Sequence, residues 1–174
     1  MPESNTQTNN LPDPNDPEPE PLSVEINIQH HSDASEDEIR QVVFQILNDN
    51  SWEFGEVSVA IVDDATIHQL NRQFLDHDYE TDVLSFVIDQ DPDCHMLNGE
   101  IIVSSDTASR VAKEEGVSTK HELLLYIIHG ALHLAGFDDK DPAKRELMRL
   151  AESKYTSQFG IQYVPPSGEE IEEG

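Results

Sequence analysis

Cysteine, aromatic residues and basic residues are all scarce in this chain of 174 residues. Cys94 is the only cysteine, so an internal disulfide is excluded, as is typical of proteins from a reducing compartment. No apolar stretch approaches the roughly 20 residues of a membrane-spanning helix, and no sequence typical of a signal peptide opens the chain. These absences predict a soluble, cytoplasmic protein of one domain with no membrane partner.

The chain has only 10 basic residues against 36 acidic residues, which gives a formal net charge of −26. Residues 1–22 hold five of the acids and the last six residues hold four, so the rest carries 27 acids against 10 bases, a net charge of −17. Such a charge repels nucleic acid. Most of the bases lie in the last third, where they form either a local positive rim or ordinary solvated helix faces: Lys113, Lys120, Lys140, Lys144, Arg145, Arg149 and Lys154.

The two ends of the chain differ in composition from the middle. Residues 1–22 are rich in Pro, Asn, Asp and Glu, and residues 164–174 are similar. Segments with so few large apolar side chains bury too little surface to offset the entropy of ordering. We therefore expect disordered acidic tails at 1–22 and 164–174, on either side of a single domain at 23–163.

Within that domain, apolar alternation or short apolar runs predict strands at residues 23–29, 55–62, 83–88 and 99–104, with a loop at 89–98. Helical periodicity predicts five helices, ending near residues 48, 74, 115, 135 and 159. Four of them have capping residues, at Ser35, Asp64, Thr119 and Asp141. The pattern predicts an α+β domain with a small mixed sheet and about five helices. Apolar residues expected to pack the second and last helices are Ile67, Leu70, Phe74, Leu147, Leu150, Ala151 and Tyr155.

One stretch specifies a chemical geometry, at residues 127–139, which read I-I-H-G-A-L-H-L-A-G-F-D-D. His129 and His133 are four residues apart, so on a helix both imidazoles leave the same face. Gly136 suits the left-handed residue that ends such a helix. Asp139 follows at a place where the reversed chain can deliver a third ligand. We predict one zinc-like ion held by His129, His133 and Asp139, although two helix histidines with unrelated roles are the alternative.

The same spacing matches the metzincin pattern H-E-x-x-H-x-x-G-x-x-H, with two departures. Gly130 stands where a metalloprotease has the glutamate that takes a proton from water, so a peptidase mechanism lacks its base. Asp139 replaces the third imidazole. Two His, one Asp and an open position still describe a catalytic type of zinc site. No catalytic base is assigned from the sequence.

The motif resembles the H-G-x-L-H-L-x-G-Y-D-H signature of the YbeY family of bacterial metal-dependent endoribonucleases. Two further blocks are similar to that family in the same order: residues 71–86, with N-R and T-D-V-L-S-F, and residues 98–104, N-G-E-I-I-V-S. The resemblance spans about residues 24–160. It implies the zincin-like YbeY fold, one zinc ion, and single-strand-specific cleavage of RNA in maturation of the 3′ end of 16S rRNA and in ribosome quality control.

Some positions depart from the family or have open roles. Leu75 stands where the family pattern N-R-x-Y-R has an arginine, and leucine cannot hydrogen-bond phosphate. Arg72 is a candidate for binding substrate in its place, or an ordinary exposed helix residue. Thr81 and Ser85 match the family and either line the cleft or cap local structure. Asp138 either orients a ligand histidine or caps the adjacent turn.

Three functions follow. The first is the endoribonuclease that the resemblance implies, with ribosomal RNA precursors and the ribosome as partners. The second is a metallohydrolase of another substrate, favoured by the acidic charge and by Leu75. The third is a ribosome-associated binding protein whose metal site is structural or degenerate.

Overall fold

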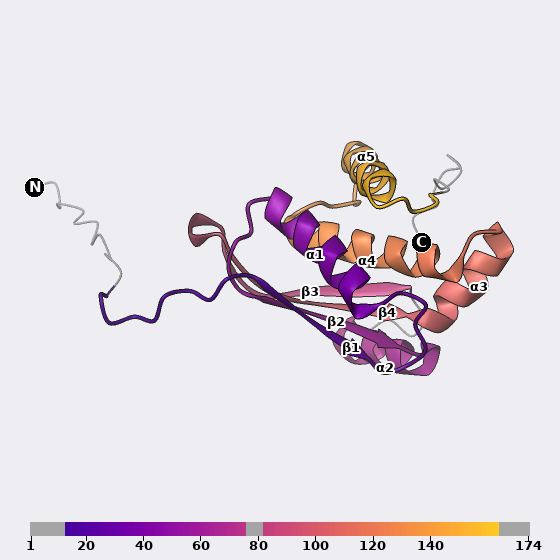
Figure 1. Ribbon diagram of the computed structural model, residues 1–174, viewed down its shortest axis with the longest axis horizontal. Coiled ribbons are helices and arrows are strands. Elements are labelled where there is room, and N and C mark those ends of the chain that lie inside the picture. Colours follow the sequence, from indigo (N-terminus) through magenta and orange to yellow (C-terminus); the bar gives the residue numbers. More distant parts are fainter. Residues whose placement is uncertain (1–12, 76–81, 164–174) are drawn as a thin grey trace, which may run out of the picture.

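The computed structural model describes residues 13–75 and 82–163, and Figure 1 shows how their helices and strands are arranged. In chain order the elements are β1 (Ser23–Ile28), α1 (Glu36–Asp49), β2 (Glu56–Val62), α2 (Asp64–Leu75), β3 (Val83–Asp91), the 3₁₀ turn η1 (Pro92–Cys94), β4 (Met96–Ser104), α3 (Ser105–Glu115), α4 (Thr119–Ala135) and α5 (Pro142–Gln158). None of the helices in these ranges has the length and apolarity needed to cross a membrane.

The described strands form one mixed sheet in the order β1-β2-β4-β3. β1 and β4 both run parallel to β2, whereas β3 pairs antiparallel with β4. The central strands β2 and β4 carry runs of Val and Ile, as strands covered on both faces do. The predicted α+β class with a small mixed sheet is confirmed.

Helices cover the sheet in unequal layers. α1 and α4 lie on one face, α5 packs over α4, and α2 covers the other face (Figure 1). The main core lies between the sheet and the α1/α4 layer, and its fully buried members include Ile46, Leu47, Ile101, Ile127 and Leu132. α4 therefore sits at the centre of the fold, which is where the metal motif was predicted.

The expected loop at residues 89–98 is wrong. β3 continues to Asp91, η1 turns the chain, and β4 begins at Met96, so the two strands form a long hairpin. Its outer part is polar because backbone pairing with β4 carries β3 beyond the core, past a register shift between Val87 and Asp89. Apolar periodicity does not report such an extension.

Two of the expected helix caps shift by one residue. Asp63 accepts the hydrogen bond from the Thr66 N–H at 2.8 Å, whereas Asp64 is the first residue of α2. Ser118, not Thr119, caps α4. Neighbouring residues of the same capping chemistry made each pair ambiguous in sequence.

Several residues expected in the core are exposed, while one tail residue is buried. Phe74 of α2 is 59% exposed. Leu147 and Leu150 are 58% and 61% exposed, because the buried face of α5 is formed by Met148, Ala151 and Tyr155 instead. Leu22 is 8% exposed, and its N–H bonds to the carbonyl of Glu53. The packed chain thus reaches at least to Leu22.

Candidate metal centre

His129 and His133 lie on one face of α4 near its C-terminal end. Their Nε2 atoms are 3.0 Å apart and their ring centroids are 4.6 Å apart. Most side chains of α4 are buried, and Ser118 caps the helix by accepting a hydrogen bond from the His121 N–H. Burial and capping restrict the motion of α4, so the two imidazoles are held as a fixed pair.

The turn after α4 brings Asp139 back to the two histidines. Gly136 ends the helix with φ of 115°, in the left-handed region that favours glycine. The Asp138 carboxylate then accepts hydrogen bonds from the backbone N–H groups of Asp139 and Lys140, at 2.7 and 3.2 Å. As a result, Asp139 Oδ2 lies 3.5 Å from His129 Nε2 and 3.6 Å from His133 Nε2.

These three atoms, His129 Nε2, His133 Nε2 and Asp139 Oδ2, form a donor triangle with sides of 3.0, 3.5 and 3.6 Å. Tetrahedral zinc with bonds of about 2.0–2.2 Å separates its ligand atoms by about 3.3–3.6 Å. The donor triangle therefore fits such an ion with small movements. The structure brings the three predicted ligand side chains together, and their coordination of a metal stays a prediction.

Glu152 of α5 supports the donor triangle from behind and was missed in the sequence. Its Oε1 accepts a hydrogen bond from His129 Nδ1 at 2.5 Å, and its Oε2 accepts one from the Tyr163 hydroxyl at 2.9 Å. A proton held on Nδ1 leaves Nε2 of His129 with a lone pair aimed at the donor triangle. Carboxylate–histidine pairs of this kind orient ligand histidines in metal sites.

A signal for Glu152 was present in the sequence. With Met148, Ala151 and Tyr155 it occupies the buried face of α5, although Glu152 itself is an acid and is only 7% exposed. A buried carboxylate requires a partner. A single charged residue on an otherwise apolar helical stripe is therefore a usable marker of such a contact.

Asp138 was weighed as the residue that orients a histidine. Its carboxylate instead binds the backbone of its own turn and lies 3.8 Å from Lys144 Nζ. The structure therefore favours the capping alternative, in which Asp138 fixes the loop that carries Asp139.

The pKa values of His129 and His133 are shifted in opposite directions. Burial opposes protonation of His129, but the hydrogen bond to Glu152 and the charges of Glu152, Asp139 and Asp82 outweigh it, so the pKa of His129 is raised. Burial lowers the pKa of His133, and the neighbouring charge on His129 lowers it further. The neighbouring carboxylates thus favour the protonated form of His129, whereas the lowered pKa of His133 favours its neutral form.

Gly130 shows why the protease glutamate is absent. A Cβ built on Gly130 would lie 2.9 Å from Ile101 Cγ2 and 3.1 Å from Val83 Cγ2, closer than side chains normally pack. Position 130 therefore faces the sheet, and glycine allows α4 to approach β3 and β4. A glutamate there would enter the packed interface instead of the donor triangle.

The remaining sequence candidates are less well placed. Arg72 is exposed on α2, with its Nη2 atom 3.4 Å from His68 Nε2, in the layer on the opposite face of the sheet from α4. Its role in substrate binding stays a prediction. Ser85 is half-buried on β3, on the same side as Val83, which faces α4. The Leu75 side chain and Thr81 lie outside the described residues.

Comparison with known proteins gives the family. A sequence model of the family described as Endoribonuclease YbeY matches residues 24–160. Endoribonuclease YbeY of Rhodopirellula baltica is 47% identical over 118 residues, which cover 67% of this chain and 59% of that protein. The Salinibacter ruber protein of the same name is 35% identical over 144 residues, which cover 79% of this chain and 90% of that protein.

A solved structure agrees with these matches. The solution structure of TM1509 from Thermotoga maritima has a TM-score of 0.54 and 28% sequence identity, over 78% of this chain and 91% of that chain. The family match runs from β1 to the end of α5 and contains the whole donor triangle together with Glu152. The resemblance seen in the sequence is confirmed, and the chain belongs to the Endoribonuclease YbeY family.

Proposed function

We propose that this chain is a metal-dependent endoribonuclease specific for single-stranded RNA. The observation that supports it is a donor triangle able to hold a metal, on the central helix of a member of a family named for endoribonuclease activity. The further steps are that the substrate is precursor RNA of the ribosome, that the enzyme acts at the 3′ end of 16S rRNA and in ribosome quality control, and that it works in the cytoplasm.

The proposed cofactor is one zinc ion held by His129, His133 and Asp139. Two imidazoles and a carboxylate are a donor set that zinc accepts, and a site with three protein ligands keeps a position open for reactants. The carboxylate–histidine contact from Glu152 is a second feature of such sites. Bound zinc would supply a Lewis acid for a phosphoryl oxygen and a source of hydroxide near neutral pH.

The protein side chains prepare this chemistry by position. Glu152 holds the Nδ1 proton of His129, so that Nε2 faces the reaction site. Asp138 fixes the turn that carries Asp139. Position 130 faces the sheet and supplies no base, so the proposed reaction relies on positioning and charge. RNA brings its own nucleophile in the 2′-hydroxyl, so cleavage can proceed without a glutamate at position 130.

A polyanion must still approach an acidic protein. Lys140 follows Asp139 directly, and Lys144, Arg145 and Arg149 lie on the first half of α5, next to the turn that bears Asp139. Lys144 is already within 3.8 Å of carboxylates of Asp138 and Asp141, which reduces its pull on phosphate. We propose that the RNA backbone enters along this side, with binding that weakens steeply as salt rises.

The test is cleavage of a labelled single-stranded RNA by purified full-length protein, with and without a chelator. His133→Ala removes a proposed ligand, and His95→Ala, an exposed histidine hydrogen-bonded to the Ser51 carbonyl, is the matched control. Cleavage that the chelator and His133→Ala abolish, but His95→Ala does not, supports the proposal. Bound metal without RNA cleavage points to another substrate, and absence of metal points to a binding protein.

A further inference from the structure

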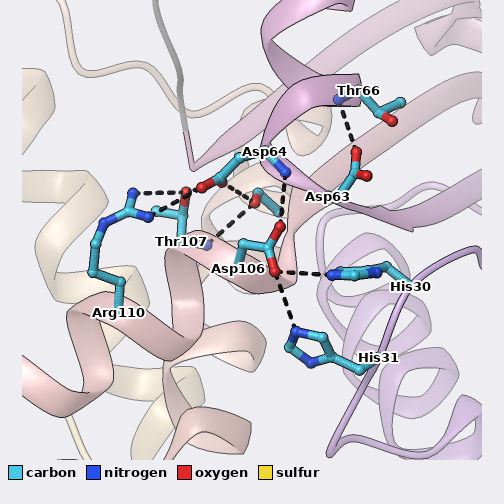
Figure 2. A network of polar contacts seen from close by, with 9 residues as sticks. His30, His31, Asp63, Asp64, Thr66, Asp106, Thr107 and Arg110 are labelled. Atoms are coloured by element: carbon cyan, nitrogen blue, oxygen red, sulfur yellow. Dashed lines mark hydrogen bonds and ion pairs between the residues drawn. The ribbon is translucent and has the colours of Figure 1, made fainter.

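A second cluster of metal-binding side chains lies between the segment after β1 and the first turn of α3 (Figure 2). His30 Nε2 lies 2.8 Å from Asp106 Oδ1, and His31 Nε2 lies 3.3 Å from the same oxygen. One donor atom from each of these three residues lies within 4.8 Å of the other two. Within the described ranges, the donor triangle is the only other group of this kind.

The Asp106 carboxylate is fixed before any ligand arrives. Its Oδ2 accepts a hydrogen bond from the Asp64 backbone N–H at 3.1 Å, so Oδ1 is the atom that faces both imidazoles (Figure 2). His30 and His31 are adjacent in sequence, yet both rings turn toward that oxygen, with centroids 4.5 Å apart. Adjacent side chains usually point in different directions, so two neighbouring imidazoles that both contact Asp106 Oδ1 form a specific arrangement.

The surrounding charges favour a cation. Hydrogen bonds from Thr66 hold the pKa of Asp63 below its usual value, and the backbone N–H of Asp64 does the same for Asp106. Burial opposes ionisation of Asp64, but hydrogen bonds from Ser104, Thr107 and Arg110 outweigh it and lower its pKa too.

This network thus holds three carboxylates, of Asp63, Asp64 and Asp106, and one guanidinium, that of Arg110, whose Nη1 atom lies 3.0 Å from Asp64 Oδ2. Three carboxylate charges against one guanidinium charge leave an excess of two negative charges, which a divalent ion balances. The N-terminus of α3 opposes a cation with only about half an elementary charge.

We propose that His30, His31 and Asp106 form a second metal site, for a divalent transition ion such as zinc. Two imidazoles and one carboxylate suit zinc, nickel or copper better than magnesium or calcium, which prefer oxygen ligands. The donors need to move by no more than about 1.5 Å to reach tetrahedral spacing. The bound ion replaces the Nε2 protons that now face Asp106.

The consequence is a structural link between distant segments. His30 and His31 precede α1, whereas Asp106 lies in the first turn of α3, which packs against α4. An ion at this site clips the segment after β1 to the helix beside the donor triangle. The His30 and His31 side chains are 36% and 49% exposed, against 28% for His129 and for His133, which predicts an exchangeable ion, bound more weakly than one in the donor triangle.

The experiment counts zinc equivalents on metal-stripped full-length protein by calorimetric titration, independently of RNA cleavage. Wild type and His95→Ala should bind two equivalents. His133→Ala should lose the stronger one, and the double variant His30→Ala/His31→Ala should lose the weaker one. Asp106→Asn, which keeps the shape of the side chain, should weaken that equivalent by about tenfold or more.

The melting temperature tests the second site without relying on zinc binding at the donor triangle. In the His133→Ala background, zinc should still raise the melting temperature, because it binds the folded state at the second site. Adding His30→Ala/His31→Ala should abolish that rise. The proposal is overturned if wild type binds a single equivalent that His133→Ala abolishes, or if the weaker equivalent survives in the double variant and in Asp106→Asn as adventitious surface binding.

Discussion

Replacing Glu152 by glutamine tests whether the buried carboxylate governs the metal centre. The change keeps the size of the side chain and its contact with the Tyr163 hydroxyl, but it removes the charge 2.5 Å from His129 Nδ1. A glutamine amide can also donate to Nδ1, which would place the imidazole proton on Nε2, the atom proposed to bind metal.

The expected size follows from similar contacts in metal proteins. Loss of a hydrogen-bond partner behind a ligand histidine costs about 10- to 100-fold in metal affinity. This corresponds to about 1.4–2.8 kcal/mol. Tyr163→Phe removes only the hydrogen bond to the other oxygen of Glu152, so we expect a smaller loss of roughly 2- to 10-fold.

The assay is competition for zinc against a chromophoric chelator, together with the melting temperature of each metal-free variant. Glu146→Gln, an exposed acid on the same helix, is the control and should bind zinc as wild type does. If Glu152→Gln lowers the melting temperature while leaving the zinc dissociation constant unchanged, Glu152 only joins α5 to α4 and the reasoning is refuted.

Further substitutions test other parts of the argument. Asp139→Ala should weaken zinc binding by removing one of three ligands, while Asp139→His should preserve or tighten it; equal affinities in all three proteins would exclude Asp139 as a ligand. Gly130→Ala should lower the melting temperature by roughly 2–5 °C. Overpacking against Ile101 costs about 1–3 kcal/mol, which exceeds the gain in helix propensity of up to about 1 kcal/mol. A higher melting temperature would contradict the close approach of α4 to the sheet. Deletion of residues 1–19 should leave the melting temperature unchanged, whereas deletion through Leu22 should lower it by roughly 5–10 °C; equal values would show that Leu22 adds no stability. Leu75→Arg should accelerate RNA cleavage by roughly 10- to 100-fold without changing metal content, and a stable variant with an unchanged rate would remove that position from the chemistry.

The donor triangle could be predicted from sequence because its geometry is local. The spacing of His129 and His133 follows from the helical repeat, and Gly136 marks where the chain reverses toward Asp139. Glu152 and the pair His30/His31 come from other elements. Their contacts depend on how α5 packs on α4 and on how the segment after β1 approaches α3, which no spacing along the chain encodes.

The fold, too, has features that the sequence predicts locally and features that depend on contacts between elements. Apolar periodicity located the five α-helices that the structure describes, since burial of one face dictates that period, but it did not locate the 3₁₀ turn η1. It failed at the polar hairpin after Val87, which is held by backbone pairing. It also failed at Phe74, whose ring contacts Phe86 of β3 but stays 59% exposed because α2 leaves part of that sheet face open. Periodicity reports which residues avoid water, and it cannot show how completely a neighbouring layer covers them.

The carboxylates of Asp139 and Glu152 place negative charge at the donor triangle. Asp139 and Glu152 both lie within hydrogen-bonding or ion-pairing reach of His129, and their charges, with that of Asp82, raise its pKa. Neutral imidazoles would leave two negative charges in contact with the ring pair, and a divalent ion cancels them. A third imidazole in place of Asp139 would leave one more positive charge at the centre. The aspartate thus makes the centre less attractive to phosphate in a chain already at −26, so contacts from the Lys140 to Arg149 side should carry more of the RNA affinity.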